Sequence, residues 1–399
     1  MGRDGEQERL ITPRFLVVTG AALAYFIALG ILAPVLPVFV EDELGGGSLA
    51  VGFSVGAFAL SAALLRPVVG RIGDRRGRRV LVLAGSAIAG VSILGYALAS
   101  SVPILILLRI GTGVGEAAMF VGAATAVQDM APPSRRGEAA SYFSVAVYGG
   151  LGIGPVIGDV VRIHWGFDAV WVAAAIACAV TVLLAFEMDE DKAVDDPLEP
   201  PPGEVSLFRR FFHPAAVRPG LILAMSTTGY AGFAAFVPLY ISDVGVASAG
   251  PVFALYAGCV LVVRIFGAKL PDRLGPVKAG SMALVLQAAG FAILALVGTA
   301  FGLYFGTFVY SLGVSLLYPA LFPIVVGGAP EAERSQAIAT FTLFFDVSQG
   351  LGAFALGAVV ALGSERWAFA AAGVLDVLGL VMLRARAAEV RRLVPAPSG

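Results

Sequence analysis

Charged residues are scarce in this sequence. Asp, Glu, Lys and Arg together make up 14% of its 399 residues, whereas soluble domains average about a quarter. Apolar residues account for 58% of the chain. This composition excludes an ordinary soluble domain and favours a protein whose surroundings are largely lipid.

Cysteine and histidine are also scarce. Cys178 and Cys259 lie singly in apolar runs, which excludes a disulfide or cysteine-based metal framework. His164 and His213 lie in expected loops and cannot form a ligand pair. The sequence shows no nucleotide-binding loop and no Ser/His/Asp arrangement. We therefore expect no metal, no cofactor, no nucleic-acid partner and no enzymatic activity.

Long apolar runs, in contrast, recur through the whole chain. Twelve of them approach the roughly 20 residues that a helix needs to cross a bilayer. Helices satisfy their own backbone hydrogen bonds in hydrocarbon, so the sequence predicts an all-α integral membrane protein. The expected spans are 15–40, 49–69, 80–100, 102–128, 138–161, 167–186, 218–241, 249–267, 279–298, 300–326, 337–361 and 366–384.

The basic residues indicate how the spans are oriented. If the amino terminus is cytoplasmic, most of the 27 Lys and Arg residues fall in cytoplasmic loops. This distribution is the one that the positive-inside preference produces. We therefore expect both termini in the cytoplasm of a bacterium, and a multi-pass protein of the inner membrane.

The sequence also repeats itself. A shift of 198 residues places Arg66 on Arg264 and Gly77 on Gly275, and it carries the spans from 49 to 161 onto later ones. Transporters use parallel repeats of this kind to enclose a site at mid-membrane. The expected organisation is a leader at 1–14, a six-helix half at 15–186, a linker at 187–217, a second six-helix half at 218–384 and a tail at 385–399.

One charged stretch, GRIGDRRGRR at 70–79, stands out within the first half. The positive-inside preference explains its five arginines, but not its aspartate or its glycines. The stretch resembles the loop signature between the second and third helices of the major facilitator superfamily, and 272–275 is a weaker copy. LGILAPVLP in the first span and RIGTGVGEA in the fourth resemble further motifs of that family, and the resemblance covers nearly the whole chain.

The resemblance implies a cytoplasmic latch between the halves. In that family the aspartate faces the start of the eleventh helix, here near Gln336 and Ala337, where backbone N–H groups attract an anion. The arginines reach an acid at the end of the fourth helix. The latch residues expected here are Gly70, Asp74, Arg75, Gly77, Arg78, Asp129, Asp272 and Arg273.

The stretch GLGIGPVIG at 150–158 resembles the signature of drug:proton antiporters. Gly150, Gly154 and Gly158 recur every four residues, so one helix face is bare backbone that a second helix can approach closely. Pro155 is expected to bend this helix. Packing alone also explains the spacing, and the association with export comes from the resemblance.

Charges inside membrane spans are costly and are therefore candidates for function. Glu116 is the first candidate for carrying a proton, because Arg109 lies two turns away on the same face. Asp346 is the second, and pairing with neighbouring helices is the alternative. Weaker candidates are Asp159 and Asp376, whereas Arg66 and Arg264 are expected to extend toward the helix ends or to join the latch.

The resemblance implies a cavity lined by the first, fourth, seventh and tenth helices. Aromatic rings alternate there with hydroxyl groups, which predicts a mostly apolar site. Packing is again the alternative for these stripes. The expected lining is Tyr25, Thr112, Phe120, Ser226, Tyr230, Phe233, Phe308, Ser311, Ser315 and Tyr318.

Together these features predict a monomeric, proton-coupled exporter of hydrophobic or amphipathic small molecules that works by alternating access. The alternative is a proton-coupled exporter or symporter of a sugar or another polar metabolite. That site would need more hydrogen-bonding groups than the stripes offer. A sensor or scaffold would normally carry an additional soluble domain, which the sequence does not predict.

Overall fold

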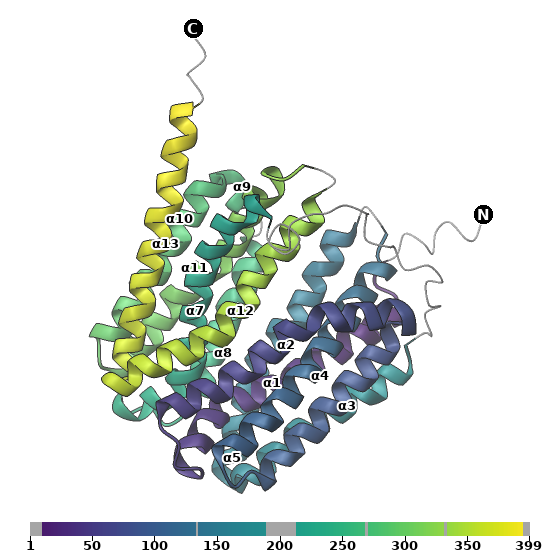
Figure 1. The fold of residues 1–399 in the computed structure, drawn as a ribbon. Coiled ribbons are helices and arrows are strands. Elements are labelled where there is room, and N and C mark those ends of the chain that lie inside the picture. The colour runs from purple at the N-terminus through teal and green to yellow at the C-terminus, as the bar shows by residue number, and fades with distance from the viewer. Residues whose placement is uncertain (1–9, 133–134, 189–212, 268–269, 331–332, 394–399) are drawn as a thin grey trace, which may run out of the picture. The chain divides into compact units, whose positions relative to one another are not determined.

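The computed structural model describes residues 10–132, 135–188, 213–267, 270–330 and 333–393, and the regular structure in these ranges is helical throughout. Figure 1 shows the helices in chain order. They are α1 (Pro13–Asp42), α2 (Ser48–Arg76), α3 (Arg78–Leu94), the 3-10 turn η1 (Gly95–Leu98), α4 (Val102–Met130), α5 (Arg136–Phe186), α7 (Pro214–Asp243), α8 (Gly250–Phe266), α9 (Leu270–Leu274), α10 (Pro276–Leu296), α11 (Ala300–Gly327), α12 (Arg334–Leu362) and α13 (Glu365–Leu393).

Ten of the described helices are long and apolar enough to cross a membrane, and α8 is a shorter apolar helix. The 51-residue α5 contains two helices that meet at Gly166, whose φ of 79° and ψ of −175° interrupt the helical backbone. The fold is therefore an all-α membrane fold. The count of twelve spans stays a prediction.

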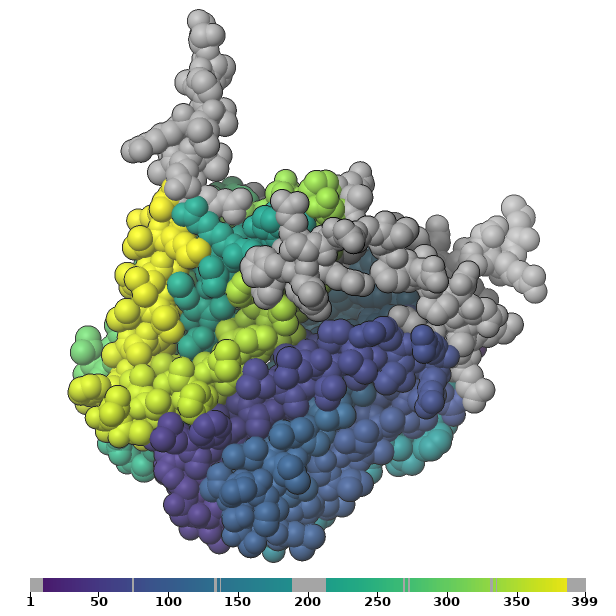
Figure 2. Space-filling view, in the orientation of Figure 1, coloured from purple at the N-terminus to yellow at the C-terminus, as the bar shows by residue number. Residues whose placement is uncertain are grey.

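Two compact units make up the chain. The first comprises Met1–Pro201 with Ser248–Gly258, and the second comprises Pro202–Ala247 with Cys259–Gly399, so the division falls within α8. Inside the first unit α1 packs on α5, and α4 packs on α2 and α3; inside the second, α7 packs on α12 and α10 on α11 and α13. On the face drawn in Figure 2, side chains of neighbouring helices lie against one another. Most of the expected linker, at 189–212, lies outside the described residues.

Two expected boundaries differ in the structure. The sequence predicts a loop over 70–79, but α2 continues to Arg76 and α3 begins at Arg78. Gly77 alone makes the turn, with φ 88° and ψ 158°, a backbone conformation that suits glycine. Gly275 makes the equivalent turn before α10, with φ 79° and ψ 155°. The predicted tail from 385 is also helical as far as Leu393.

Candidate functional site

Glu116 on α4 is a buried carboxylate in the first unit, and it forms an ion pair with Arg66 on α2. Arg66 Nη2 lies 3.3 Å from Glu116 Oε1, and the Glu116 side chain is 8% exposed. The same guanidinium lies over the Phe120 ring, 5.0 Å from its centroid. Glu116 and Phe120 are one helical turn apart and so face Arg66 together. The sequence predicts that Arg66 extends toward the helix end or joins the latch, whereas in the structure its guanidinium lies against Glu116.

Arg109 is buried too, but its contacts lie elsewhere. Its Nε donates to the Ser54 carbonyl oxygen at 3.0 Å, and its Nη1 lies 3.5 Å from the Tyr96 hydroxyl. Its guanidinium lies 4.5 Å from the centroid of the Phe58 ring. The Tyr96 hydroxyl in turn bonds to Thr112 Oγ1 at 2.6 Å. The cation that pairs with Glu116 is thus Arg66, whereas Arg109 is held by a carbonyl, a hydroxyl and an aromatic ring.

Asp346, the second candidate for proton coupling, lies buried on α12 in the other unit. Tyr318 lies in the neighbourhood of Thr342, Asp346 and Arg264. The 198-residue shift relates Arg264 to Arg66 and Tyr318 to Phe120. An arginine, an aromatic residue and a carboxylate therefore occur near one another in both units, with the carboxylate on α4 in one and on α12 in the other.

The charged stretch at 70–79 comprises the end of α2, the turn at Gly77 and the start of α3, and Arg78 in it forms an ion pair. Arg78 Nε lies 3.3 Å from Asp129 Oδ2 at the end of α4, where Asp129 is 57% exposed. Arg79 lies over the Phe186 ring at 5.9 Å. Gly73 is packed tightly, because a Cβ there would lie 2.5 Å from Leu81 Cδ1. The side chains of Asp74 and Asp272 are not among those described, so their latch contacts stay predictions.

The glycines of α5 bring α1 into close contact. A Cβ on Gly150 would lie 2.7 Å from the Ile27 nitrogen, and one on Gly154 would lie 2.5 Å from the Ile27 carbonyl oxygen. A Cβ on Gly158 would lie 2.2 Å from the Ile31 carbonyl oxygen. The glycine face therefore serves close helix packing, as the spacing indicates. The helix continues through Pro155, and the predicted bend stays a prediction.

Another face of α5 meets the first part of α8. Asp159 is 3% exposed, and its Oδ2 accepts hydrogen bonds from Ser248 Oγ at 2.6 Å and from the Gly250 backbone N–H. Arg162 Nε lies 3.9 Å from Asp159 Oδ1. This carboxylate thus has two donors and a cation, and it caps the start of α8.

The expected cavity residues have contacts within their own units, and the cavity itself stays a prediction. Tyr25 is buried and meets Phe26 edge to face at 5.9 Å. Ser226 donates to Gln287 Oε1 at 2.6 Å. The hydroxyls of Ser311 and Ser315 bond to carbonyl oxygens of their own helix. The remaining members are Phe233, packed on Tyr310; Tyr318, packed on Phe322 and Phe341; Tyr230, half-buried; and Phe308, 40% exposed.

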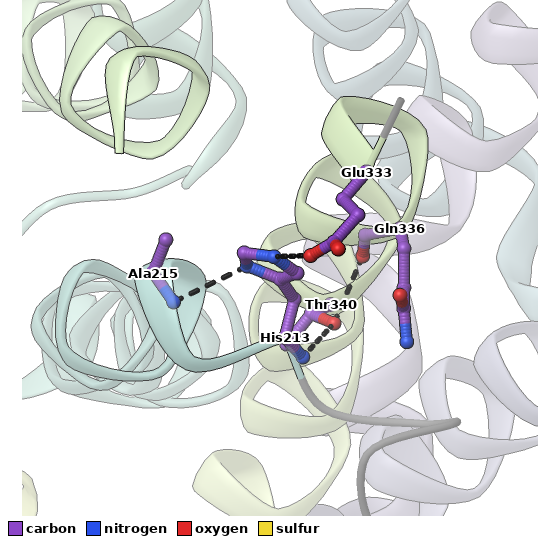
Figure 3. A network of polar contacts seen from close by, with 5 residues as sticks. All are labelled: His213, Ala215, Glu333, Gln336 and Thr340. Carbon is purple, nitrogen blue, oxygen red and sulfur yellow. Dashed lines mark hydrogen bonds and ion pairs between the residues drawn. The ribbon is translucent and has the colours of Figure 1, made fainter. Parts of the chain in front are cut away.

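A polar network that the sequence does not predict joins the start of α7 to the start of α12 (Figure 3). His213 Nδ1 accepts the Ala215 N–H at 3.2 Å, and His213 Nε2 lies 2.9 Å from Glu333 Oε2. The His213 backbone N–H donates to Thr340 Oγ1 at 2.9 Å, and that hydroxyl donates to the Gln336 carbonyl oxygen. Because Nδ1 accepts, Nε2 carries the proton of the neutral ring and donates to the carboxylate. A histidine just before a proline-started helix is the only sequence signal for this network.

The sequence of this chain is similar to known proteins. The model of the Major Facilitator Superfamily matches residues 18–326 and 247–398. The chain belongs to the major facilitator superfamily. An uncharacterized MFS-type transporter of Salmonella typhimurium is 27% identical over 346 residues, which cover 84% of this chain and 86% of the relative.

Two further similarities concern named transporters. Multidrug resistance protein 1 of Bacillus subtilis is 26% identical over 302 residues, which cover 74% of this chain and 77% of that protein. The crystal structure of a POT family transporter in complex with a thioalcohol-conjugated peptide matches with a TM-score of 0.78 at 13% identity, over 95% of this chain and 96% of that chain. The second similarity shows the fold alone. This protein is therefore a multi-pass membrane transporter.

Proposed function

We propose that this protein is a proton-coupled exporter of hydrophobic or amphipathic small molecules. It works by alternating access in a bacterial inner membrane, with both termini in the cytoplasm. The buried Arg66–Glu116 ion pair is the observation that carries the proton coupling. The glycine and proline stretch of α5 and the similarity to a multidrug resistance protein support the direction and the class of substrate.

Glu116 binds and releases the proton in this proposal, and Arg66 controls how tightly it does so. An ion pair favours the charged carboxylate, while burial disfavours it. The attraction between the two charges is strong in a dry site and weak where water enters. Opening the site to one side of the membrane therefore changes how tightly Glu116 holds its proton. Arg109 has a structural role instead, because it holds α2 and η1 in place.

The turn between α2 and α3 acts as the cytoplasmic latch. Gly77 allows α3 to start immediately after α2, which places Arg78 against Asp129 at the end of α4. Asp74 is the group that we propose to bind the start of α12. Each contact has to break during transport, so each should contribute only a few kcal/mol.

An efflux assay in cells tests the proposal. Cells that lack their own pumps should accumulate less of a lipophilic dye when they express this protein, and an ionophore that collapses the proton gradient should abolish the difference. Glu116→Gln is the matched control, since it keeps the shape of the side chain and cannot take up a proton. Unchanged accumulation over a varied panel of dyes would contradict the proposal and favour a polar metabolite as substrate.

A further inference from the structure

Asp376, near the middle of α13, is a buried carboxyl group that the proposed mechanism does not use. Its exposed fraction is 0%. Neither Oδ1 nor Oδ2 has a hydrogen-bond partner among the described residues. An ionised carboxylate without donors or a cation is very costly to bury, more so than a neutral carboxylic acid. The surroundings of Asp376 therefore favour the protonated form.

The neighbours of Asp376 follow from the packing one turn to each side of it. On one side, a Cβ on Gly373 would lie 3.4 Å from Phe291 Cβ of α10. On the other side, a Cβ on Gly379 would lie 3.5 Å from Leu284 of α10 and 3.6 Å from Ile222 of α7. Asp376 thus lies at the level where α7, α10 and α13 pack together.

The same level contains the hydrogen bond between Ser226 of α7 and Gln287 of α10. Ser226 lies one turn from Ile222, and Gln287 lies one turn from both Leu284 and Phe291. Gln287 is 0% exposed, and its Nε2 has no hydrogen-bond acceptor among the described residues. An amide donor without an acceptor and a carboxyl group without a donor therefore lie in one layer of three helices. We call Ser226, Gln287 and Asp376 the polar layer.

The first unit has neither an acid nor an amide at the two equivalent positions. The 198-residue shift relates Asp376 to Cys178 and Gln287 to Ala89, and both of these residues are buried. A Cβ on Gly90 would lie 3.2 Å from Cys178 Cβ, so the corresponding helices make the corresponding contact. Small residues stand at these two positions in the first unit, so the packing there does not require an acid.

We propose that Asp376 is a second proton-binding site, separate from Glu116. It holds a proton as a neutral carboxylic acid in the packing seen here, and Gln287 Nε2 donates to the carboxylate after the proton has passed to entering water. The protonation of Asp376 does not depend on the proposed direction of transport, whereas its use in coupling does.

Asp346 of α12 is the charged residue close to this level, because it lies two residues before Ser348, whose hydroxyl bonds to Thr227 next to Ser226. Tyr230 of α7 lies one turn beyond Ser226. The other ionisable groups on the described parts of the helices that pack against α13 are Arg218, Tyr240 and Asp243 on α7, Lys278 on α10, and Arg334 on α12. Gln287 is therefore the donor that the layer itself provides for an ionised Asp376.

Infrared spectroscopy of the purified full-length protein tests this site without requiring transport. The difference between wild-type and Asp376→Asn spectra should contain the C=O stretch of a carboxylic acid at neutral pH. That band should persist in Glu116→Gln and in Asp159→Asn, and it should weaken as the pH is raised. A spectrum without the band, or a band that remains up to the pH at which the protein unfolds, would overturn the proposal.

The role of Gln287 is tested by the same titration. Gln287→Met keeps the length of the side chain and removes the donor, so the acid band should persist to a pH about one unit higher, because a hydrogen bond to a carboxylate favours its charged form. Gln287→Leu serves as the second variant if the first does not fold. An unchanged titration would overturn the assignment of Gln287.

Thermal unfolding distinguishes the hydrogen-bonded carboxylate of Asp159 from the carboxyl group of Asp376. Asp159→Asn should lower the unfolding temperature, whereas Asp376→Asn should not.

Discussion

The two units share one helical scaffold but differ in how they treat buried charge. In the first unit the buried charges have partners: Glu116 has Arg66, Arg109 has the Ser54 carbonyl oxygen, and Asp159 has Ser248 and the Gly250 N–H. In the second unit the positions equivalent to Arg109 and Glu116 under the 198-residue shift are Thr307 and Val314. Asp376 there has no hydrogen-bond partner among the described residues.

The two units therefore share backbone geometry more closely than side-chain chemistry. Gly77 and Gly275 make the same left-handed turn before α3 and α10. The close contacts of α5 with α1 depend on glycines of α5, whereas at the equivalent level Leu356 of α12 packs against Gly232 of α7. Helix packing can exchange a large and a small residue between partners, but a buried charge requires its own partner. The charged chemistry is thus specific to each unit.

The largest effect on transport is expected from replacing Asp74, the latch aspartate of the first unit. Asp74→Asn should lower transport about tenfold or more, because losing a contact of 1.4 kcal/mol already changes an equilibrium about tenfold. Asp272→Asn, the matched change in the degraded copy, should lower it much less. Transport rates in proteoliposomes at equal protein content measure both. Equal losses in the two variants would remove the distinction between the copies.

Replacing a tightly packed glycine should destabilise the first unit. Gly154→Ala should lower stability by about 1–3 kcal/mol, the usual cost of overpacking, because its Cβ would meet the backbone of α1. Gly70→Ala is the control, since a Cβ there meets nothing within 4 Å, and it should be neutral or slightly stabilising. Thermal unfolding in detergent compares them. A Gly154→Ala protein as stable as the control would mean that α1 is not held as described.

A smaller loss is expected where α7 meets α12. His213→Ala should cost about 1 kcal/mol, the usual contribution of a helix cap. His213→Asn provides an acceptor for the Ala215 N–H and should recover part of that loss, but it lacks the donor to Glu333. Thermal unfolding of the three proteins checks the order. The cap assignment fails if His213→Asn is no more stable than His213→Ala.

The smallest effect concerns the exposed pair at the end of α4. Reversing the charges of Arg78 and Asp129 together should recover part of the transport that either reversal loses, and their coupling should be within about 1 kcal/mol. Reversing Arg75 with Asp129 should recover less, because the resolved contact is made by Arg78. A transport assay on the single and double variants gives both couplings. Equal recovery with Arg75 would contradict the pairing.

Composition and periodicity were sufficient to predict the helices, because a bilayer requires long apolar helical runs. They misplaced the end of α2, since glycines and arginines are typical of loops, yet Gly77 alone makes the turn. The expected break between the spans 138–161 and 167–186 is present, but Gly166 alone makes it, because one glycine at positive φ is enough to interrupt a helix.

The partners of the buried charges could not be predicted in the same way. Sequence spacing relates Arg109 to Glu116 along one helix, whereas Arg66 reaches Glu116 from α2 across 50 residues of chain. Only the packing of α2 on α4 brings the two together. The fully buried state of Asp376 also depends on three helices, and no local pattern in α13 indicates it.

Substrate-induced proton release from the detergent-solubilised protein shows whether Glu116 couples substrate binding to protons. Adding a lipophilic substrate to the wild-type protein should release protons, because binding displaces the proton from Glu116. Glu116→Gln should bind the substrate and release far fewer protons, whereas Asp346→Asn should have a smaller effect. If Glu116→Gln releases as many protons as the wild type, Glu116 is not the coupling carboxylate and the account is contradicted.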